Sequence, residues 1–344
     1  MRIMNSHSLL SAMQKMPKID LHRHLEGSIK PETLIHIVKT YGGVLPTCDI
    51  TALRSCIQMN NETPGFKNFL KKFEVYRGFY TSREAIEYAA SRAVYEAAAD
   101  NVKYLELRYS PSHFAGRGRF CESDVVEWIN GSLKRTSKDC GIIVVPVLTI
   151  SRDYGFDLAS ATVDLALSLP EGYFYGLDIA GDEIANSAKP FAALFDKFRA
   201  NGLGVTVHAG EVCGAHNVRQ AIDEFDACRI GHGIRAVDDT ELMHILSELD
   251  VLLEVCLTSN IHTAAVPSLR EHPIKKLIHA NVPVSLNTDD PAISNIVLSD
   301  EYFCAAATLG FSVDVLKDLN RAALRHAFHP DHAWLERQIG HYWQ

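Results

Sequence analysis

The chain has 344 residues, a formal net charge of −8 and 47% hydrophobic against 22% charged residues. This composition is typical of a globular protein with a large buried core. The acidic balance argues against nucleic acid or an anionic membrane surface as a partner, and is compatible with an enzyme that acts on a small uncharged molecule.

Cysteine usage and the N-terminal residues indicate where the chain works. Eight cysteines are scattered without a C-x-x-C pair, which argues against a zinc ribbon or a thioredoxin-type site. We therefore expect reduced thiols and a cytoplasmic location. Residues 1–16 lack the apolar core and cleavage site of a signal peptide, and no apolar run is long enough to span a bilayer.

Hydrophobic patterning predicts strands that alternate with helices along the whole chain. A first strand ends at His22 and His24, and further strands are predicted at 102–111, 142–150, 174–181, 204–211, 229–233, 251–257 and 282–291. Helices are predicted at 30–41, 82–99, 123–138, 158–169, 189–201, 217–224, 239–249 and 274–279. Eight strand–helix units predict an α/β fold, a (β/α)8 TIM barrel forming a single domain over 1–344. A doubly wound sheet is the competing fold, but no G-x-G-x-x-G follows the first strand.

Additional helices are expected at the C-terminus, after residue 300, and in the loop after the first strand. Ser28 is a plausible N-cap for the helix at 30–41, and Gly42 and Gly43 are expected to end it. A second helix in this loop is predicted from apolar residues at helical spacing: Phe66, Phe69, Leu70, Phe73 and Tyr76. Such a stripe either packs on a core or walls a ligand pocket.

The second predicted strand carries two charges on one face, Glu106 and Arg108. In a strand that is buried on both sides, we expect them to form a buried ion pair in the barrel interior.

Polar residues gather at the ends of the predicted strands. His22 and His24 share one face of the first strand because their spacing is i, i+2. The other strand ends carry Asp178, Gly181, His208, Glu211, His232, Asp289 and Asp290. Because barrel closure brings all strand ends to one mouth, these side chains are expected to surround one catalytic divalent ion, Zn²⁺ in the first instance.

The motifs at these strand ends are similar to those of the adenosine deaminase family. They appear in family order over about residues 16–310, at 22–27, 177–183, 207–211, 230–233, 257–260 and 287–291. The resemblance implies zinc-dependent hydrolytic deamination of adenosine and 2′-deoxyadenosine to inosine and deoxyinosine, with release of ammonia. The partner is then a small purine nucleoside.

The resemblance also implies roles for individual residues. His22, His24, His208 and Asp289 would hold one Zn²⁺ per chain. Glu211 would protonate purine N1, while His232 and Asp289 would orient the water and accept its proton. The purine and sugar would be bound by Asp290 at N7, by the Gly181 N–H at N3 and by Glu26 toward the ribose hydroxyls, and His24 would also contact the substrate.

Simpler readings exist for single residues and for the chain as a whole. Glu211 could cap a helix, Asp290 could belong to a turn, and Gly181 could mark a tight bend. The alternative activities are adenine deaminase or a deaminase of a modified adenosine such as aminodeoxyfutalosine. An AMP deaminase is disfavoured because no phosphate cluster is evident, and a purine-binding barrel without activity is the non-enzymatic alternative. The oligomeric state stays open.

Two positions depart from the family pattern, and one group of histidines could form a second metal site. Ala264 stands where many relatives carry Gly, and 292–295 lacks a common Gly, which puts the nucleoside preference in doubt. His326, His329 and His332 could form a second metal cluster, although a solvated helix end explains them more simply.

Overall fold

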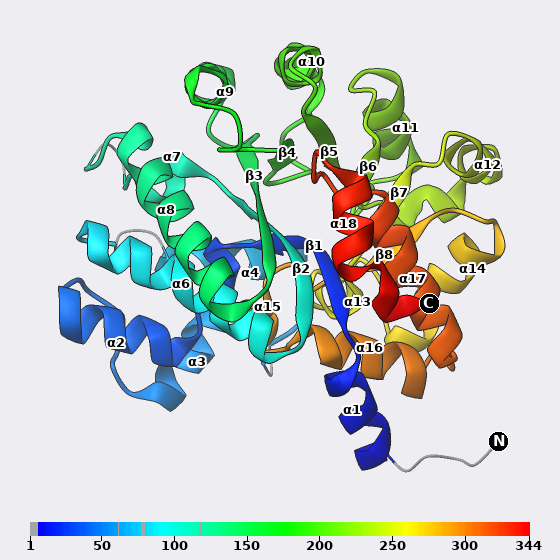
Figure 1. The fold of residues 1–344 in the computed structure, drawn as a ribbon, viewed down its shortest axis with the longest axis horizontal. Coiled ribbons are helices and arrows are strands. Elements are labelled where there is room, and N and C mark those ends of the chain that lie inside the picture. The colour runs from blue at the N-terminus through cyan, green and yellow to red at the C-terminus, as the bar shows by residue number, and fades with distance from the viewer. Residues whose placement is uncertain (1–5, 61, 77–79, 117–118) are drawn as a thin grey trace.

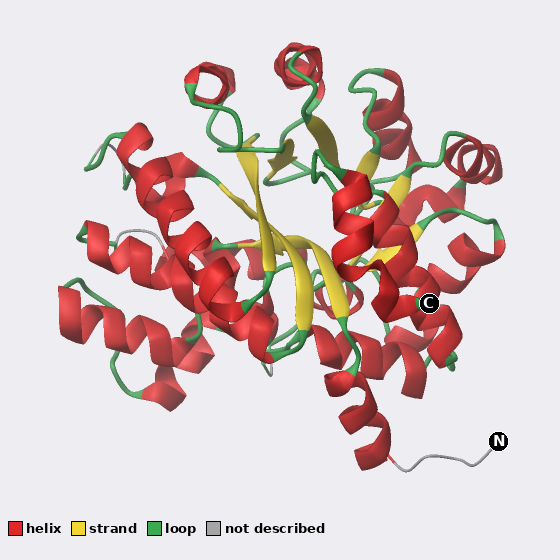
Figure 2. Cartoon of the chain, in the orientation of Figure 1, coloured by secondary structure: helices red, strands yellow, loops and turns green. Residues whose placement is uncertain are grey.

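A computed structural model describes residues 6–60, 62–76, 80–116 and 119–344. Within them, eight parallel strands pair in chain order. Their bounds are β1 (Lys18–His24), β2 (Val102–Tyr109), β3 (Ile143–Ser151), β4 (Gly176–Ala180), β5 (Gly204–Ala209), β6 (Arg229–His232), β7 (Leu252–Val255) and β8 (Val284–Leu286). The strands occupy the centre and the helices surround them (Figure 2). The predicted (β/α)8 TIM barrel is confirmed.

The first and last strands close the barrel through a short seam beyond the end of β8. Arg23 and Asp289 form an isolated parallel bridge. The Asp289 N–H donates to the His22 carbonyl at 2.8 Å, and the His24 N–H donates to the Asp289 carbonyl at 2.9 Å. The seam therefore ties the two strand ends that carry predicted metal ligands directly to each other.

Helices cover the outside of the barrel and extend it at both ends of the chain (Figure 1). Those that connect consecutive strands include α6 (Arg83–Ala99), α8 (Glu122–Cys140), α9 (Phe156–Ser168), α10 (Ala192–Ala200), α11 (Ala215–Asp223), α12 (Thr240–Glu248) and α14 (Ile274–His279). The additional ones are α1 (Ser6–Lys15), α2 (Pro31–Tyr41), α3 (Ile50–Ile57), α4 (Phe66–Lys71), α5 (Phe73–Tyr76), α7 (Pro111–Phe114), α13 (Leu257–His262), α15 (Pro291–Ser294), α16 (Leu298–Ala307), α17 (Val313–Arg325) and α18 (His332–Ile339). The helices expected after the first strand and at the C-terminus are thus present.

The loop after β1 differs in detail from the prediction. Ser28 does not cap α2: it lies in the 3-10 turn η1 (Glu26–Ser28), and its hydroxyl donates to the His24 carbonyl at 2.6 Å. Lys30 is the N-cap instead, while Gly42, with φ of +84°, ends α2 as expected. The aromatic stripe forms two short helices, α4 and α5, rather than one.

Charged residues fill the interior below the barrel mouth. Glu106 and Arg108 are both fully buried, as expected, but they do not pair with each other. Arg229 bridges Glu106 and Glu254, and Arg108 bridges Glu254 and Asp178. Glu106 and Arg108 lie on β2, whereas the partners of these two residues lie on β4, β6 and β7, so each charge is paired across the barrel interior. We refer to these five residues as the interior network.

The C-terminal segment seals the opposite end of the barrel. The Phe328 ring lies 3.5 Å from the Arg229 guanidinium. A side chain at Gly176 or Gly204, at the start of β4 and β5, would collide with this ring. The two glycines therefore admit an aromatic plug beneath the interior network.

The two departures from the family pattern fall on unusual backbone. Ala264 has φ of +59° and Asn295 has φ of +54°. This left-handed region suits Gly, is tolerated by Asn and is costly for Ala. The backbone conformation thus persists at Ala264 although the glycine is absent.

All eight cysteines are free. Among the described residues, none of the helices combines the length and apolar character required to cross a bilayer.

Candidate active site

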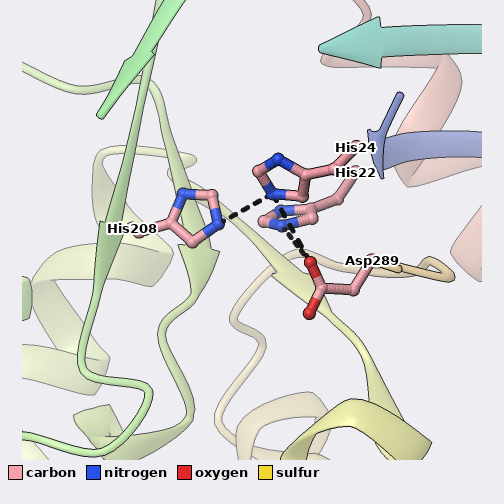
Figure 3. A group of neighbouring side chains, drawn as sticks. All are labelled: His22, His24, His208 and Asp289. Carbon is pink, nitrogen blue, oxygen red and sulfur yellow. Dashed lines mark hydrogen bonds and ion pairs between the residues drawn. The ribbon is translucent and has the colours of Figure 1, made fainter. Parts of the chain in front are cut away.

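Three histidines and one aspartate converge at the barrel mouth (Figure 3). His22 and His24 come from β1, His208 from β5, and Asp289 follows β8. One ligand atom from each lies within 4.8 Å of the others. His24 Nε2 lies 3.2 Å from His208 Nε2, and Asp289 Oδ1 lies 3.3 Å from His22 Nε2 and 3.5 Å from His24 Nε2.

The four side chains fit a divalent metal ion. His22 Nε2 is buried and makes no hydrogen bond with any described residue. Imidazole nitrogens that face one another and a carboxylate oxygen are the donor set of catalytic Zn²⁺ sites. Within the described residues this is the single metal-type cluster, and His326, His329 and His332 are not part of one.

The interior network holds two of these histidines from behind. Glu254 Oε2 lies 2.7 Å from His22 Nδ1, and Asp178 Oδ1 lies 2.9 Å from His208 Nδ1. Arg108 contacts both carboxylates, at 2.8 and 3.0 Å. A carboxylate on Nδ1 fixes the ring and leaves the Nε2 lone pair for a metal. Sequence reasoning missed Glu254, although a carboxylate inside the apolar strand β7 was a usable signal.

A cavity of about 150 Å³ opens beside the metal-type cluster. The predicted site residues that line it are His24, Glu26, Gly181, His208, Glu211, His232, Asp289 and Asp290. Of the residues predicted at the strand ends, His22 and Asp178 do not line the cavity. Phe66, Phe69, Leu70 and Phe73 form another part of the wall, so the aromatic stripe does contribute to a pocket. Among the described residues that line the cavity, none is Lys or Arg.

Three acidic side chains in this cavity have hydrogen-bonding capacity to spare. Glu211 Oε1, Asp290 Oδ1 and Glu26 Oε2 are buried, and none makes a hydrogen bond with a described residue. Glu26 Oε1 accepts from the Ser110 N–H at 2.7 Å. Buried acceptors without partners are rare in proteins, and here they point to bound ligand.

Burial also changes the charge of these groups. It raises the pKa of Glu211 well above its ordinary value, with further increases from the negative charges of Asp289 and Glu183. Burial and the charges of Asp289 and Glu26 likewise raise the pKa of Asp290. Burial raises the pKa of Glu26 to about 7, against the opposing Ser110 N–H. These raised pKa values favour the protonated form of Glu211 and Asp290, the form that can donate a proton.

Asp289 and His232 occupy strained backbone at the mouth. Their φ angles are +59° and +61°, in the left-handed region that non-glycine residues seldom adopt. The Ser259 hydroxyl donates to Asp289 Oδ2 at 2.6 Å. His232 Nε2 lies 3.7 Å from Glu211 Oε2 and 4.0 Å from Asp289 Oδ2.

Two further residues shape the site without having been predicted. A side chain at Gly27 would collide with Asp290, so Gly27 makes room for that carboxyl. The Glu183 carboxylate accepts from the backbone N–H groups of residues 210–213, at 2.5–3.2 Å, and thereby fixes the turn that carries Glu211. Gly181, with φ of +109°, lies at the tight end of β4.

A parallel barrel whose mouth gathers three histidines, an aspartate and protonated carboxyl groups is the architecture of a metal-dependent barrel hydrolase. The family model "Adenosine deaminase" matches residues 17–337. The chain belongs to the adenosine deaminase family and is a hydrolytic deaminase.

Relatives and solved structures agree with this assignment. An adenosine deaminase of Edwardsiella ictaluri is 36% identical over 91% of this chain and 94% of its own length. The adenine deaminase of Arthrobacter aurescens is 26% identical with a TM-score of 0.87, over 95% of this chain and 99% of that one. The N6-mAMP deaminase of arabidopsis is 29% identical with a TM-score of 0.84, over 97% and 99%.

Proposed function

We propose that this protein deaminates adenosine and 2′-deoxyadenosine to inosine and deoxyinosine, with release of ammonia. The observation that carries the proposal is the position of a protonated carboxyl, Glu211, in a small cavity beside the His/Asp cluster. Hydrolysis of a purine amine needs an acid at the ring nitrogen and an activated water at the adjacent carbon, and this cavity offers groups for both.

His22, His24, His208 and Asp289 would hold one Zn²⁺, which when bound supplies a hydroxide at neutral pH. Glu211 donates its proton to purine N1 as water adds at C6. The O–H of Asp290 donates to N7, and the backbone N–H of Gly181 donates to N3. These contacts orient the ring and exclude bases that lack the matching acceptors.

Asp289 and His232 face the reacting carbon together. Asp289 keeps its negative charge: burial opposes ionisation, but the close contact with His22 and the neighbouring imidazoles of His232 and His24 hold its pKa well below the ordinary value. Asp289 therefore accepts a proton from water. Glu26, at the edge of the same cavity, is available to a sugar hydroxyl.

The lining of the cavity bears on the choice among base, nucleoside and nucleotide. A phosphate group would find no Lys or Arg among the described lining residues and would meet Asp153 and Glu26 instead. This supports an uncharged substrate over a nucleotide such as N6-mAMP, the substrate in the name of one structural relative. Adenine is the second candidate, favoured by the 26% identical adenine deaminase.

The location proposed for this activity is the cytoplasm. The eight free cysteines suit a reducing compartment.

A substrate panel tests the proposal directly. Release of the leaving amine, ammonia or, from N6-methyl-AMP, methylamine, is measured for adenosine, 2′-deoxyadenosine, adenine, aminodeoxyfutalosine and N6-methyl-AMP, with metal-stripped and zinc-restored protein. We expect kcat/KM for adenosine to exceed that for each of the last three by more than about tenfold, and to depend on zinc. A higher kcat/KM for adenine, aminodeoxyfutalosine or N6-methyl-AMP than for adenosine would overturn adenosine as the substrate.

A further inference from the structure

A buried chain of polar side chains runs away from His232 on the side opposite the cavity. His232 Nδ1 lies 3.2 Å from Asn260 Nδ2, and Asn260 Oδ1 lies 3.2 Å from His272 Nε2. The backbone N–H of Ile274 donates to His272 Nδ1, also at 3.2 Å. Asn260 and His272 are 0% and 4% exposed, and neither lines the cavity. We call these two residues the relay.

The hydrogen bond from the Ile274 N–H to His272 fixes the direction of the two other hydrogen bonds in this series. The Ile274 N–H can only donate, so His272 Nδ1 must accept, and an imidazole that accepts at one nitrogen carries its proton on the other. His272 Nε2 therefore donates to Asn260, which places the amide oxygen on that side. The amide NH₂ then faces His232 and donates to its Nδ1. The hydrogen bond from the Ile274 N–H thus fixes the orientation of the Asn260 amide.

Both imidazoles are neutral, as this chain requires. Burial lowers the pKa of His272 to about 3. The amide NH₂ of Asn260 can donate to His232 Nδ1 only if that nitrogen carries no proton, so the contact itself requires a neutral His232. A neutral His232 that accepts at Nδ1 carries its one proton on Nε2, the atom that faces Glu211 and Asp289 across the cavity.

We propose that Asn260 and His272 are positioning residues that lock His232 in the Nε2–H tautomer, so that His232 donates a hydrogen bond to the oxygen that adds at C6. The proposal rests on the proposed function for the identity of that oxygen. It narrows the expected role of His232, because a nitrogen that already carries a proton cannot take one from water.

The proton balance then involves two carboxyl groups. The oxygen of water bonds to C6 and its proton passes to the Asp289 carboxylate, while the Glu211 carboxylic acid gives its proton to N1. The adduct is neutral, Asp289 is protonated and Glu211 is ionised. His232 keeps its proton throughout and supplies a fixed dipole where negative charge develops on oxygen.

The tautomer itself is measured on the unmodified zinc enzyme labelled with ¹⁵N-histidine. Long-range ¹H–¹⁵N spectra distinguish a protonated from an unprotonated ring nitrogen, and the His232 signals are assigned by their absence in His232→Gln. We expect a protonated Nε2 and an unprotonated Nδ1. The reverse pattern overturns the proposal, and it does so whichever purine the substrate panel selects.

The catalytic consequence is tested with Asn260→Asp. A carboxylate only accepts, so it forces His232 to donate from Nδ1 and removes the proton from Nε2. We expect kcat to fall by about 10²-fold, the effect of losing one such donor. KM should change by less than about threefold, because Asn260 is outside the cavity wall. In this variant the ¹⁵N spectrum should show a protonated Nδ1 and an unprotonated Nε2 for His232. The zinc content should be unchanged.

Two further variants separate tautomer control from stability. Asn320→Asp places the same charge at another fully buried asparagine, which accepts from Ile19 N–H at the far end of β1. It should lower stability comparably but leave kcat within about twofold. His272→Phe frees the amide to rotate, so intermediate ¹⁵N shifts and a smaller loss of kcat are expected. Full kcat in Asn260→Asp, or an equal loss in Asn320→Asp, overturns the positioning role.

Discussion

The mouth and the interior of this barrel both contain buried charged groups, and they use them in opposite ways. In the interior network, Glu106, Arg229, Glu254, Arg108 and Asp178 are fully buried, and each carboxylate lies within ion-pair distance of a guanidinium.

At the mouth, three acidic residues each keep a buried oxygen with no hydrogen-bond partner among the described residues. The three are Glu26, Glu211 and Asp290. Burial of ionisable groups is therefore common to both regions, whereas unused hydrogen-bonding capacity distinguishes the one that binds ligand.

The largest effect is expected from breaking the metal-type cluster. His208→Ala should lose zinc and with it nearly all activity, because the remaining side chains no longer complete the donor set. Elemental analysis of the purified variant provides the measurement. The control is His244→Ala, which removes an exposed histidine that pairs with Glu248. Unchanged zinc content in His208→Ala would contradict the ligand assignment.

Removal of the acidic proton of Glu211 should have the next largest effect. Glu211→Gln is expected to lower kcat by about 10²–10⁴-fold, because an amide cannot protonate N1. Zinc content should stay at one per chain. Glu224→Gln, at a half-buried carboxylate on the outside of the barrel that pairs with Lys189, should leave kcat unchanged. Near-normal turnover in Glu211→Gln would remove this residue from the acid role.

Removal of one charge from the interior network should lower the free energy of unfolding rather than the activity. Arg229→Met leaves Glu106 and Glu254 buried with less compensation, and the free energy of unfolding should fall by about 3–5 kcal/mol. Urea unfolding measures this. Arg199→Met, which breaks ion pairs on the surface, should cost less than about 1 kcal/mol. Equal losses in the two variants would show that the interior charges contribute nothing beyond surface pairs.

The smallest expected effect is a pH dependence of stability from the relay. His272 has a folded pKa of about 3, against about 6.5 in an unfolded chain. Between these values only the unfolded state binds the proton, so stability is complete above pH 6.5 and falls as the pH falls. From pH 6.5 to 5.5 the loss should be about 1 kcal/mol.

His272→Phe should lack this component, so the difference between the two unfolding profiles isolates it. An identical slope in both proteins would mean that His272 gains a proton in the folded state.

Sequence patterns predicted the parts of this molecule that are local or that repeat. Strand–helix alternation indicated the barrel, and polar residues at strand ends indicated His22, His208 and Asp290. What the patterns missed depends on contacts across the barrel. Glu254 was not singled out because its partner His22 is on another strand, and Glu106 and Arg108 were expected to pair with each other for the same reason.

Backbone conformation set a second limit. Serine commonly caps helices, but Ser28 lies in the 3-10 turn η1 before α2 begins. Lys30 is the N-cap of α2 instead. His272 resembled any histidine near a proline, because its meaning depends on a hydrogen bond from Ile274 that no spacing rule reveals.

The seam between β1 and Asp289 has a consequence for biosynthesis. Asp289 is among the last residues of the barrel to leave the ribosome, yet it must dock on His22 and His24, which are among the first. A nascent or truncated chain that lacks this segment cannot assemble the ion-binding cluster, however well its earlier strands have paired. The cluster is complete only after the segment that follows β8 has docked on β1, so we expect incomplete chains to have no activity.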